Sequence, residues 1–160
     1  MLNRRILSLA ALTIAIAGCA TVSTPVSVTD TIAKEPSLST LAGLLDQSGL
    51  SATLRGTGPY TVFAPSNEAF KAVNAKTMEQ LKREPEQLKA VLSFHVVQQP
   101  LKSAELKNSS VASLNGAKLA LSKAGDFVTV EEAVAQRTDI QASNGVVHII
   151  DSVLTPPAKK

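Results

Sequence analysis

The spacing of apolar residues divides the chain into two halves with different patterns. Between Ser37 and Ser48, four leucines lie on one face of a helix: Leu38, Leu41, Leu44 and Leu45. This spacing predicts an amphipathic helix that ends at Gly49. In the second half the pattern changes to short β-rich runs separated by turn residues, without a regular alternation of strands and helices. Helices mainly first and strands mainly later predict an α+β domain rather than a doubly wound sheet.

Three further helix starts are predicted from capping residues. Ser66 follows the β-rich run Tyr60–Ala64 and is a typical N-cap for the helix after it. Thr77 and Gln80 form a capping box, which predicts the start of a second short helix. Pro85 suits the first position of a third helix. The inward face of this third helix would contain Leu88, Val91 and Leu92.

Short β-rich runs predict the strands. These runs are Tyr60–Ala64, Val111–Leu114, Lys118–Ser122, Phe127–Val130, Asp139–Ala142 and Val146–Ile150. Asn115-Gly116 lies between two of the runs and predicts a hairpin with a type I′ turn. Ala124-Gly125-Asp126 and Asn144-Gly145 predict turns between later runs.

The first nineteen residues have the pattern of an export signal. Arg4 and Arg5 precede an uncharged run, Ile6–Ala17, and Gly18-Cys19 follows it. Twelve helical residues span only about 18 Å, which is too short for a hydrocarbon core of about 30 Å. The segment Ile16–Cys19 resembles the lipobox of bacterial lipoproteins, in which the signal is cut before a cysteine whose thiol is diacylated.

This resemblance implies a lipoprotein signal peptide over residues 1–18, cleavage between Gly18 and Cys19, and lipid attachment at Cys19. Residues 19–27 would then form a lipidated tether that reaches about 30 Å or less from the membrane. Ala20, rather than Asp, after the cysteine favours the outer membrane of a bacterial envelope, on its periplasmic or surface face. An ordinary signal peptide with a chance cysteine is the alternative interpretation.

Composition and charge limit the chemistry of the remaining chain. Loss of residues 1–18 removes Arg4 and Arg5, so the formal net charge falls from +3 to +1. No run of five basic residues is present, and we therefore expect no nucleic-acid partner. One cysteine and two histidines exclude a disulfide scaffold within the chain and leave a Cys/His zinc site without ligands. We predict no metal site and no cofactor.

Three separated segments resemble the motifs of the fasciclin domain. Thr61–Phe70 (TVFAPSNEAF) and Asn144–Pro156 (NGVVHIIDSVLTP) resemble its two signature segments, and Val91–Val97 (VLSFHVV) resembles its Tyr-His segment. The resemblance implies a fasciclin-like domain over residues 28–157, followed by a C-terminal tail, residues 158–160. It also implies a β-wedge of about seven strands with several short helices packed against it. The matched signature positions, expected to be mainly structural, are Thr61, Phe63, Ala64, Pro65, Asn67, Phe70, Asn144, Gly145, His148 and Asp151.

The general role of this family is adhesion and interaction at cell surfaces or in matrix. In animal members integrin binding is assigned to the Tyr-His segment and to an Asp-Ile dipeptide. The corresponding candidate interaction residues here are Phe94, His95, Asp139 and Ile140. This chain departs from the pattern, because Phe94 lacks the tyrosine hydroxyl, Thr138 stands where proline is expected, and Gln141 replaces an apolar residue. We therefore expect these positions to form a candidate interaction surface, but we do not assign integrin as its ligand. His95, His148 and Asp139-Ile140 are expected to be structural.

The leading hypothesis is a membrane-anchored, non-catalytic interaction module that binds a protein or matrix component. The alternative is a carrier for an apolar small molecule such as a lipid or pigment, although five aromatic residues offer few rings for a long polyene. An enzyme is disfavoured because no Gly-x-Ser-x-Gly motif is present and no serine has an activating context. Asp126, Glu131 and Glu132 could bind a surface cation weakly, but a solvated loop is the better interpretation.

Overall fold

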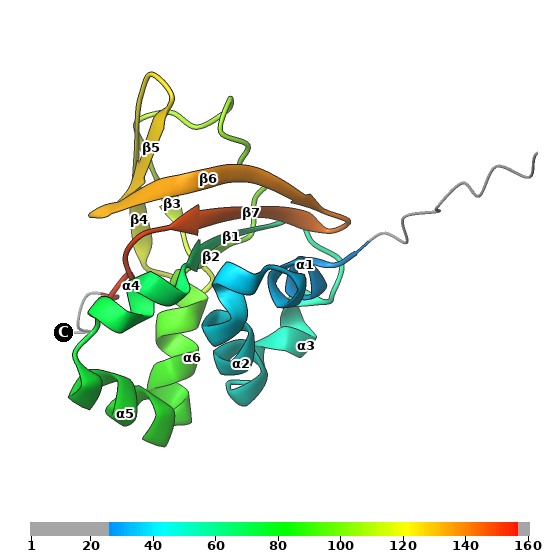
Figure 1. Cartoon of the computed structure of the whole chain (residues 1–160). Helices are drawn as coiled ribbons and strands as arrows, with labels where there is room; N and C mark the ends of the chain where they lie inside the picture. The colour runs from blue at the N-terminus through cyan, green and yellow to red at the C-terminus, as the bar shows by residue number, and fades with distance from the viewer. Residues whose placement is uncertain (1–25, 157–160) are drawn as a thin grey trace, which may run out of the picture.

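The computed structural model describes residues 26–156 and contains one seven-stranded sheet with helices on one side of it (Figure 1). The helices are α1 (Val28–Lys34), α2 (Ser39–Gln47), α3 (Leu50–Leu54), α4 (Asn67–Ala72), α5 (Ala75–Arg83) and α6 (Pro85–Phe94), with a 3₁₀ turn at Pro36–Leu38. The strands are β1 (Tyr60–Pro65), β2 (Val96–Val97), β3 (Ser109–Ala112), β4 (Lys118–Ala124), β5 (Phe127–Val130), β6 (Ala133–Ala142) and β7 (Gly145–Ile150). The predicted α+β wedge is confirmed.

The sheet has the strand order β2-β1-β7-β6-β5-β4-β3. Strands β1 and β7 form a parallel pair, in which Phe63 of β1 lies opposite His148 of β7, and the other named strand pairs are antiparallel. A further bridge joins Val97 to Ser113, which brings the β2 edge back towards the β3–β4 connection. The sheet thereby folds over on itself, and β4 and β5 cross the direction of β6 and β7 steeply (Figure 1).

The two helix starts predicted at Ser66 and Pro85 are confirmed, and the one predicted at Thr77 is wrong. Ser66 Oγ accepts a hydrogen bond from the Ala69 N–H, and Pro85 opens α6. Helix α5 begins after Asn74, whose side chain accepts from the Lys76 N–H at 2.9 Å. The amide oxygen of Asn74 thus caps the helix earlier in the chain, and Thr77 lies inside it.

The β3–β4 hairpin is confirmed, but its turn is not type I′. Five residues separate Ala112 from Lys118, and Gly116 has a φ of +88° while Asn115 is not among the positive-φ residues. A type I′ turn requires positive φ at both central residues. The Leu114 N–H donates to Val96 O at 2.7 Å, so the loop is drawn onto β2 and is longer than the local sequence indicates.

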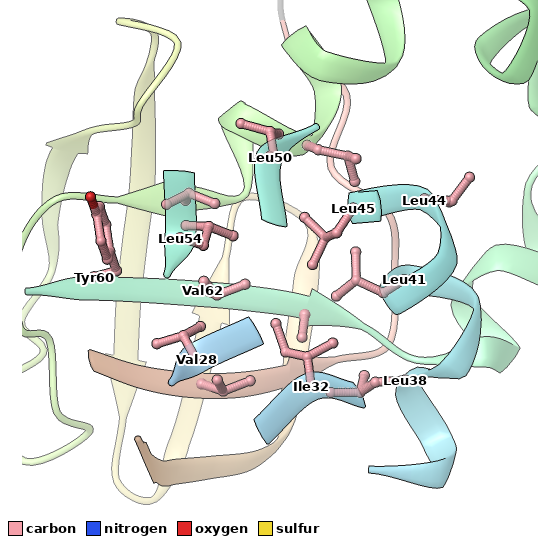
Figure 2. Packing of buried hydrophobic residues seen from close by; sticks show 14 of the residues in the cluster. Val28, Ile32, Leu38, Leu41, Leu44, Leu45, Leu50, Leu54, Tyr60 and Val62 are labelled. Atoms are coloured by element: carbon pink, nitrogen blue, oxygen red, sulfur yellow. The ribbon is translucent and has the colours of Figure 1, made fainter. Parts of the chain in front are cut away.

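Strands β1 and β7 separate two hydrophobic cores. Val62, Ala64, Val147 and Ile149 face the helices and join a core that includes Val28, Ile32, Leu41 and Leu54 (Figure 2). Phe63 and Ile150 face the other way, into the fold of the wedge. There they pack with Phe94, Leu119, Val128 and Leu154. The predicted leucine face at residues 37–48 is confirmed, since Leu38, Leu41, Leu44 and Leu45 are all buried.

Candidate functional site at the open end of the wedge

The signature residue Asn144 fastens the N-terminal helices to the centre of the sheet. Its Nδ2 donates to Leu54 O at 2.7 Å and Gly56 O at 2.8 Å. Its Oδ1 accepts from the Val28 N–H at 2.8 Å. One side chain therefore satisfies three backbone groups from two segments of the chain, which no apolar residue of similar size could do.

Gly145, the next signature residue, lies where two backbones approach closely. A Cβ placed on Gly145 would overlap Tyr60 O and lie 2.8 Å from Tyr60 C. Since these are backbone atoms of the neighbouring strand, no side-chain rotation could relieve the clash. Glycine is required here by contact rather than by its torsion angles.

The remaining polar signature residues fix loops to the wedge or the helices. Asn67 Oδ1 accepts from the Thr40 N–H at 3.0 Å and so caps α2, whose own N-cap residue, Leu38, has no side-chain cap. Thr61 Oγ1 donates to Gln99 O at 2.6 Å. Asp151 Oδ1 accepts from the Val134 N–H at 2.8 Å. The apolar signature residues are buried at Phe63, Ala64, Pro65 and Phe70.

Asp139 and His148 form a polar cluster with Ser103. The Asp139 carboxylate accepts from the Ser103 N–H at 2.7 Å and from Ser103 Oγ, while the Asp139 N–H donates to His148 Nδ1 at 3.3 Å. His148 Nε2–H donates to Leu101 O at 2.7 Å. Asp139 adopts a φ of +60° at an irregularity of β6. These bonds hold the β2–β3 connection against the sheet.

The ionisation of this cluster follows from its contacts. Burial lowers the pKa of His148, against the opposing effects of the Leu101 carbonyl and the Asp139 charge. Burial alone would raise the pKa of Asp139, but the two hydrogen bonds from Ser103, together with smaller electrostatic contributions from His148 and Lys102, lower it overall. The neutral His148 ring also stacks on Phe63, with ring centroids 5.5 Å apart. This arrangement holds a loop and leaves no ring nitrogen free for proton transfer.

Phe94 and His95 end α6 inside the wedge. His95 is 1% exposed; its Nδ1–H donates to Val91 O at 2.8 Å and its Nε2 accepts from the Leu154 N–H at 2.9 Å. Burial lowers the pKa of His95 to about 4. A neutral imidazole is the form that can donate at one nitrogen and accept at the other, so the ring positions the segment after β7.

Beside Phe94 lies a solvent-accessible recess of about 450 Å³. Phe94, Leu154 and Ala133 border it but are buried, so they expose almost no surface to it. Its rim contains Lys118, Glu131 and Glu132, which are exposed. The volume lies within the range of about 300–1,000 Å³ typical of small-molecule sites. We take this recess as the candidate functional site.

The structure does not bring the four candidate interaction residues into one site. Phe94 lines the recess and His95 holds its wall through Leu154. Asp139 contacts the β2–β3 connection, and Ile140 packs against the helix-side core. The predicted cleavage and lipid-attachment residues, Gly18 and Cys19, lie outside the described residues.

Sequence reasoning missed the position of Glu131 and the partner of Asp139. Glu131 has a φ of +55°, and its backbone and side chain both bond Ala120. The only local signal for Glu131 is the pair of adjacent acids between two β-rich runs, and an ordinary solvated loop shows the same pattern. Ser103 has no local signal, because its partner Asp139 lies 36 residues away.

Across residues 26–156, no helix is both long and apolar enough to cross a membrane. In the same part of the chain, no three or more Cys, His, Asp and Glu side chains are grouped so that they could hold a metal ion.

Comparisons with known proteins agree with the fold. The family profile of the fasciclin domain matches residues 36–156. The FAS1 domain pair of the insect cell adhesion molecule fasciclin I superposes with a TM-score of 0.68 at 15% identity, over 81% of this chain and 51% of that one. At this identity the likeness shows the fold alone.

Sequence relatives include bacterial and animal proteins. The chain is 34% identical to protein sll1483 of Synechocystis, over 89% of this chain and 81% of that protein. It is 36% identical to cell surface glycolipoprotein MPB83 of Mycobacterium bovis, over 78% of this chain and 58% of that protein. It is 38% identical to transforming growth factor-beta-induced protein ig-h3 of Sus scrofa, over 84% of this chain but only 20% of that protein.

Proposed function

Because the chain belongs to the fasciclin domain family, we propose that it is a lipid-anchored, non-catalytic interaction module of a bacterial cell envelope. The observation that carries this proposal is the family match, which covers residues 36–156 and thus most of the described chain. A relative named as a cell surface glycolipoprotein supports a role at the cell surface. The partner would be a protein or matrix component.

Anchoring is proposed from the lipobox-like segment that ends at Cys19. Acyl chains on this cysteine would give stable membrane attachment, since binding strength grows with each buried CH₂ group. Replacing Cys19 by Ala should move the protein from the outer-membrane fraction to the soluble fraction, or leave it as the uncleaved precursor. Unchanged fractionation and unchanged mobility of the Cys19→Ala variant would refute the anchor.

The interaction role is tested in the host cell. A deletion strain should lose adhesion, aggregation or biofilm formation, and the wild-type gene should restore it. The Cys19→Ala variant should restore it poorly, because the module is no longer held at the membrane. A deletion strain that behaves like its parent in all three assays would contradict the proposal.

A carrier for an apolar small molecule is the second candidate function. The observation that favours it is the recess beside Phe94, with a volume of about 450 Å³. Protein purified gently from its own host membrane would be extracted with organic solvent and examined by absorption and mass spectrometry. With no Trp and one Tyr, the absorption of the protein itself is low. A stoichiometric compound would support the carrier, and an empty protein would count against it.

A further inference from the structure

The polypeptide enters the domain at the β6–β7 turn. The Ser143 N–H donates to Val26 O at 2.8 Å, and the Val28 N–H donates to Asn144 Oδ1 at 2.8 Å. Two hydrogen bonds therefore fix the start of the described chain to this turn. A lipid on Cys19 would be joined to the domain at this point of its surface.

The tether is shorter than the domain is wide. The path from Cys19 to Val26 has seven Cα–Cα steps, so it spans at most about 25 Å. A domain of this size has a radius of gyration of about 14 Å, which corresponds to a diameter of about 36 Å. Helix α5 lies at the end of the helical layer opposite to α1 (Figure 1). If α5 faced the membrane, Val26 would be out of reach of an anchored Cys19.

The surface beside the β6–β7 turn is nearly uncharged. It contains a depression of about 300 Å³ lined by Gly58, Pro59, Pro100, Lys102 and residues 141–146. Both prolines and Lys102 are exposed. Within the described chain, Lys102 is the only charged residue in this lining. Such a surface can approach a layer of phosphate groups without bringing a carboxylate of its lining against them.

The Lys102 ammonium is available for a new partner. Among residues 26–156 it has no ion-pair partner within 4.0 Å. The Asp139 carboxylate interacts with it electrostatically, but that carboxylate accepts hydrogen bonds from the Ser103 N–H and hydroxyl. By contrast, Arg55 at the end of α3 is paired with Asp30, with a nitrogen-to-oxygen distance of 3.6 Å. The charge of Lys102 is therefore complementary to an anionic partner.

We propose that the end of the domain formed by the β6–β7 turn, Gly58-Pro59 and Pro100–Lys102 rests on the anionic headgroups of the membrane that holds the Cys19 lipid. The Lys102 ammonium would lie against their phosphates. Helix α5 would face away from the membrane, on the side from which a partner can approach. The inference rests on the proposed lipid anchor and adds the orientation of the domain to it.

Paramagnetic broadening by a gadolinium chelate on the lipid headgroups tests the orientation. The mature chain, residues 19–160, would be coupled through Cys19, the only cysteine of the sequence, to a maleimide lipid in nanodiscs of phosphatidylglycerol and phosphatidylethanolamine. NMR of the backbone amides then reports their proximity to the headgroups. Broadening should be several-fold stronger at Gly58, Lys102 and Ser143 than in α5. Equal broadening at both ends, or stronger broadening in α5, would overturn the proposal.

A longer tether separates the headgroup contact from the limit of reach. With about twenty Gly and Ser residues inserted between Thr24 and Pro25, the tether alone could no longer orient the domain. The β6–β7 end should still be the more strongly broadened. This preference should fall about fivefold in Lys102→Gln, since one basic residue near an anionic surface contributes on that scale, and should persist in Lys102→Arg. Equal broadening at both ends with Lys102 intact would overturn the headgroup contact.

Matched controls use the same long-tether chain. Lys76→Gln removes one exposed charge from α5 and should leave the preference unchanged. Phosphatidylcholine nanodiscs or added salt should weaken the preference, because the contact is electrostatic. A preference that is insensitive to both would overturn the role of Lys102. Mass spectrometry of protein from the host would show a failure of the anchor as unacylated Cys19. That result leaves the coupled-chain experiment unaffected, so the two failures are distinguishable.

Discussion

The two faces of the β1–β7 strand pair are held in different ways. On the helix side, Val62, Ala64, Val147 and Ile149 meet the apolar faces of the helices, and burial of hydrocarbon is the main cohesive force. On the wedge side, Thr61 precedes Phe63 on the same face of β1, and His148 precedes Ile150 on the same face of β7. The two polar side chains, Thr61 and His148, each fix a loop by a hydrogen bond.

This difference shows how one sheet combines stability with a defined site. Apolar contacts are non-directional, so the helix side tolerates changes that keep volume and hydrophobicity. Hydrogen bonds are directional, so the wedge side specifies where the β2–β3 connection and the segment after β7 lie. The recess beside Phe94 opens on the wedge side and depends on the second kind of contact. The following experiments examine the β1–β7 strand pair itself and then each of its sides, from the largest expected effect to the smallest.

Gly145→Ala should have the largest effect, because it forces apart strands β1 and β7, which contribute side chains to both cores. The added Cβ would overlap Tyr60 O, and we expect failure to fold or a loss of more than about 4 kcal/mol in the free energy of unfolding. Urea denaturation followed by circular dichroism measures it. The control is Gly43→Ala in α2, where nothing lies within 4 Å of a new Cβ and helix propensity predicts unchanged or higher stability. Similar losses in both variants would show that close approach at Gly145 is not the cause.

Leu41→Ala should destabilise the helix side by about 3 kcal/mol, within the usual range for a fully buried leucine. The loss combines the removed hydrocarbon and the cavity left behind. It should be the same at pH 7 and pH 5, because the helix-side core around Leu41 contains no titrating group that the change affects. Urea titrations at both pH values measure it. A pH-dependent loss would contradict the separation of the two sides.

Acid should weaken the wedge side through His95. Its pKa is lowered to about 4 in the folded protein, so its contribution is fully present above the unfolded value of 6.5 and is lost as the pH falls towards 4. The shift corresponds to about 3 kcal/mol over that interval. The lowered pKa of His148 acts in the same direction. Urea titrations between pH 7 and pH 4 measure the slope.

The variant His95→Phe should flatten this dependence while lowering stability at pH 7 by about 1–3 kcal/mol, because the Leu154 N–H loses its acceptor. Leu41→Ala, compared at the same pH values, should keep the wild-type slope. An unchanged slope in His95→Phe would show that the acid sensitivity arises elsewhere.

Ser103→Ala should have the smallest effect, about 1 kcal/mol, since it removes the hydroxyl bond to Asp139 and keeps the backbone bond. The loss should be local. Amide hydrogen exchange should accelerate between residues 98 and 108 and remain unchanged in β1 and β7. Uniform acceleration across the sheet would show that this contact supports the whole domain.

Local pattern predicted the elements whose causes are local. The leucine spacing in residues 37–48, the cap at Ser66 and the proline at Pro85 each act within one turn, and all three are confirmed. The type I′ turn at Asn115-Gly116 is wrong because Val96, far away in the sequence, draws Leu114 onto β2. Strand β6 begins at Ala133, six residues before its predicted start, and its register irregularities between Ala135 and Ile140 disrupt the alternation that a local pattern could detect.

The candidate site could not be predicted either, because it is formed by segments that are distant from one another in the sequence. The recess combines Phe94 from the end of α6, Glu131 from the β5–β6 turn and Leu154 from the segment after β7. No periodicity connects three segments that are separated by tens of residues. Phe94 and His95 were identified by family resemblance, which gave their positions in the chain but not the cavity that they border.

The bonds at Asn144 also determine how the domain would carry a mechanical load. The Ser143 N–H donates to Val26 O and the Val28 N–H donates to Asn144 Oδ1, both at 2.8 Å, so the start of the described chain is fastened directly to the β6–β7 turn. A pull applied at Val26 reaches the central strands before it reaches the helices that follow α1. The tension would act on the middle of the sheet, where each strand has a neighbour on both sides, rather than peel an edge strand away.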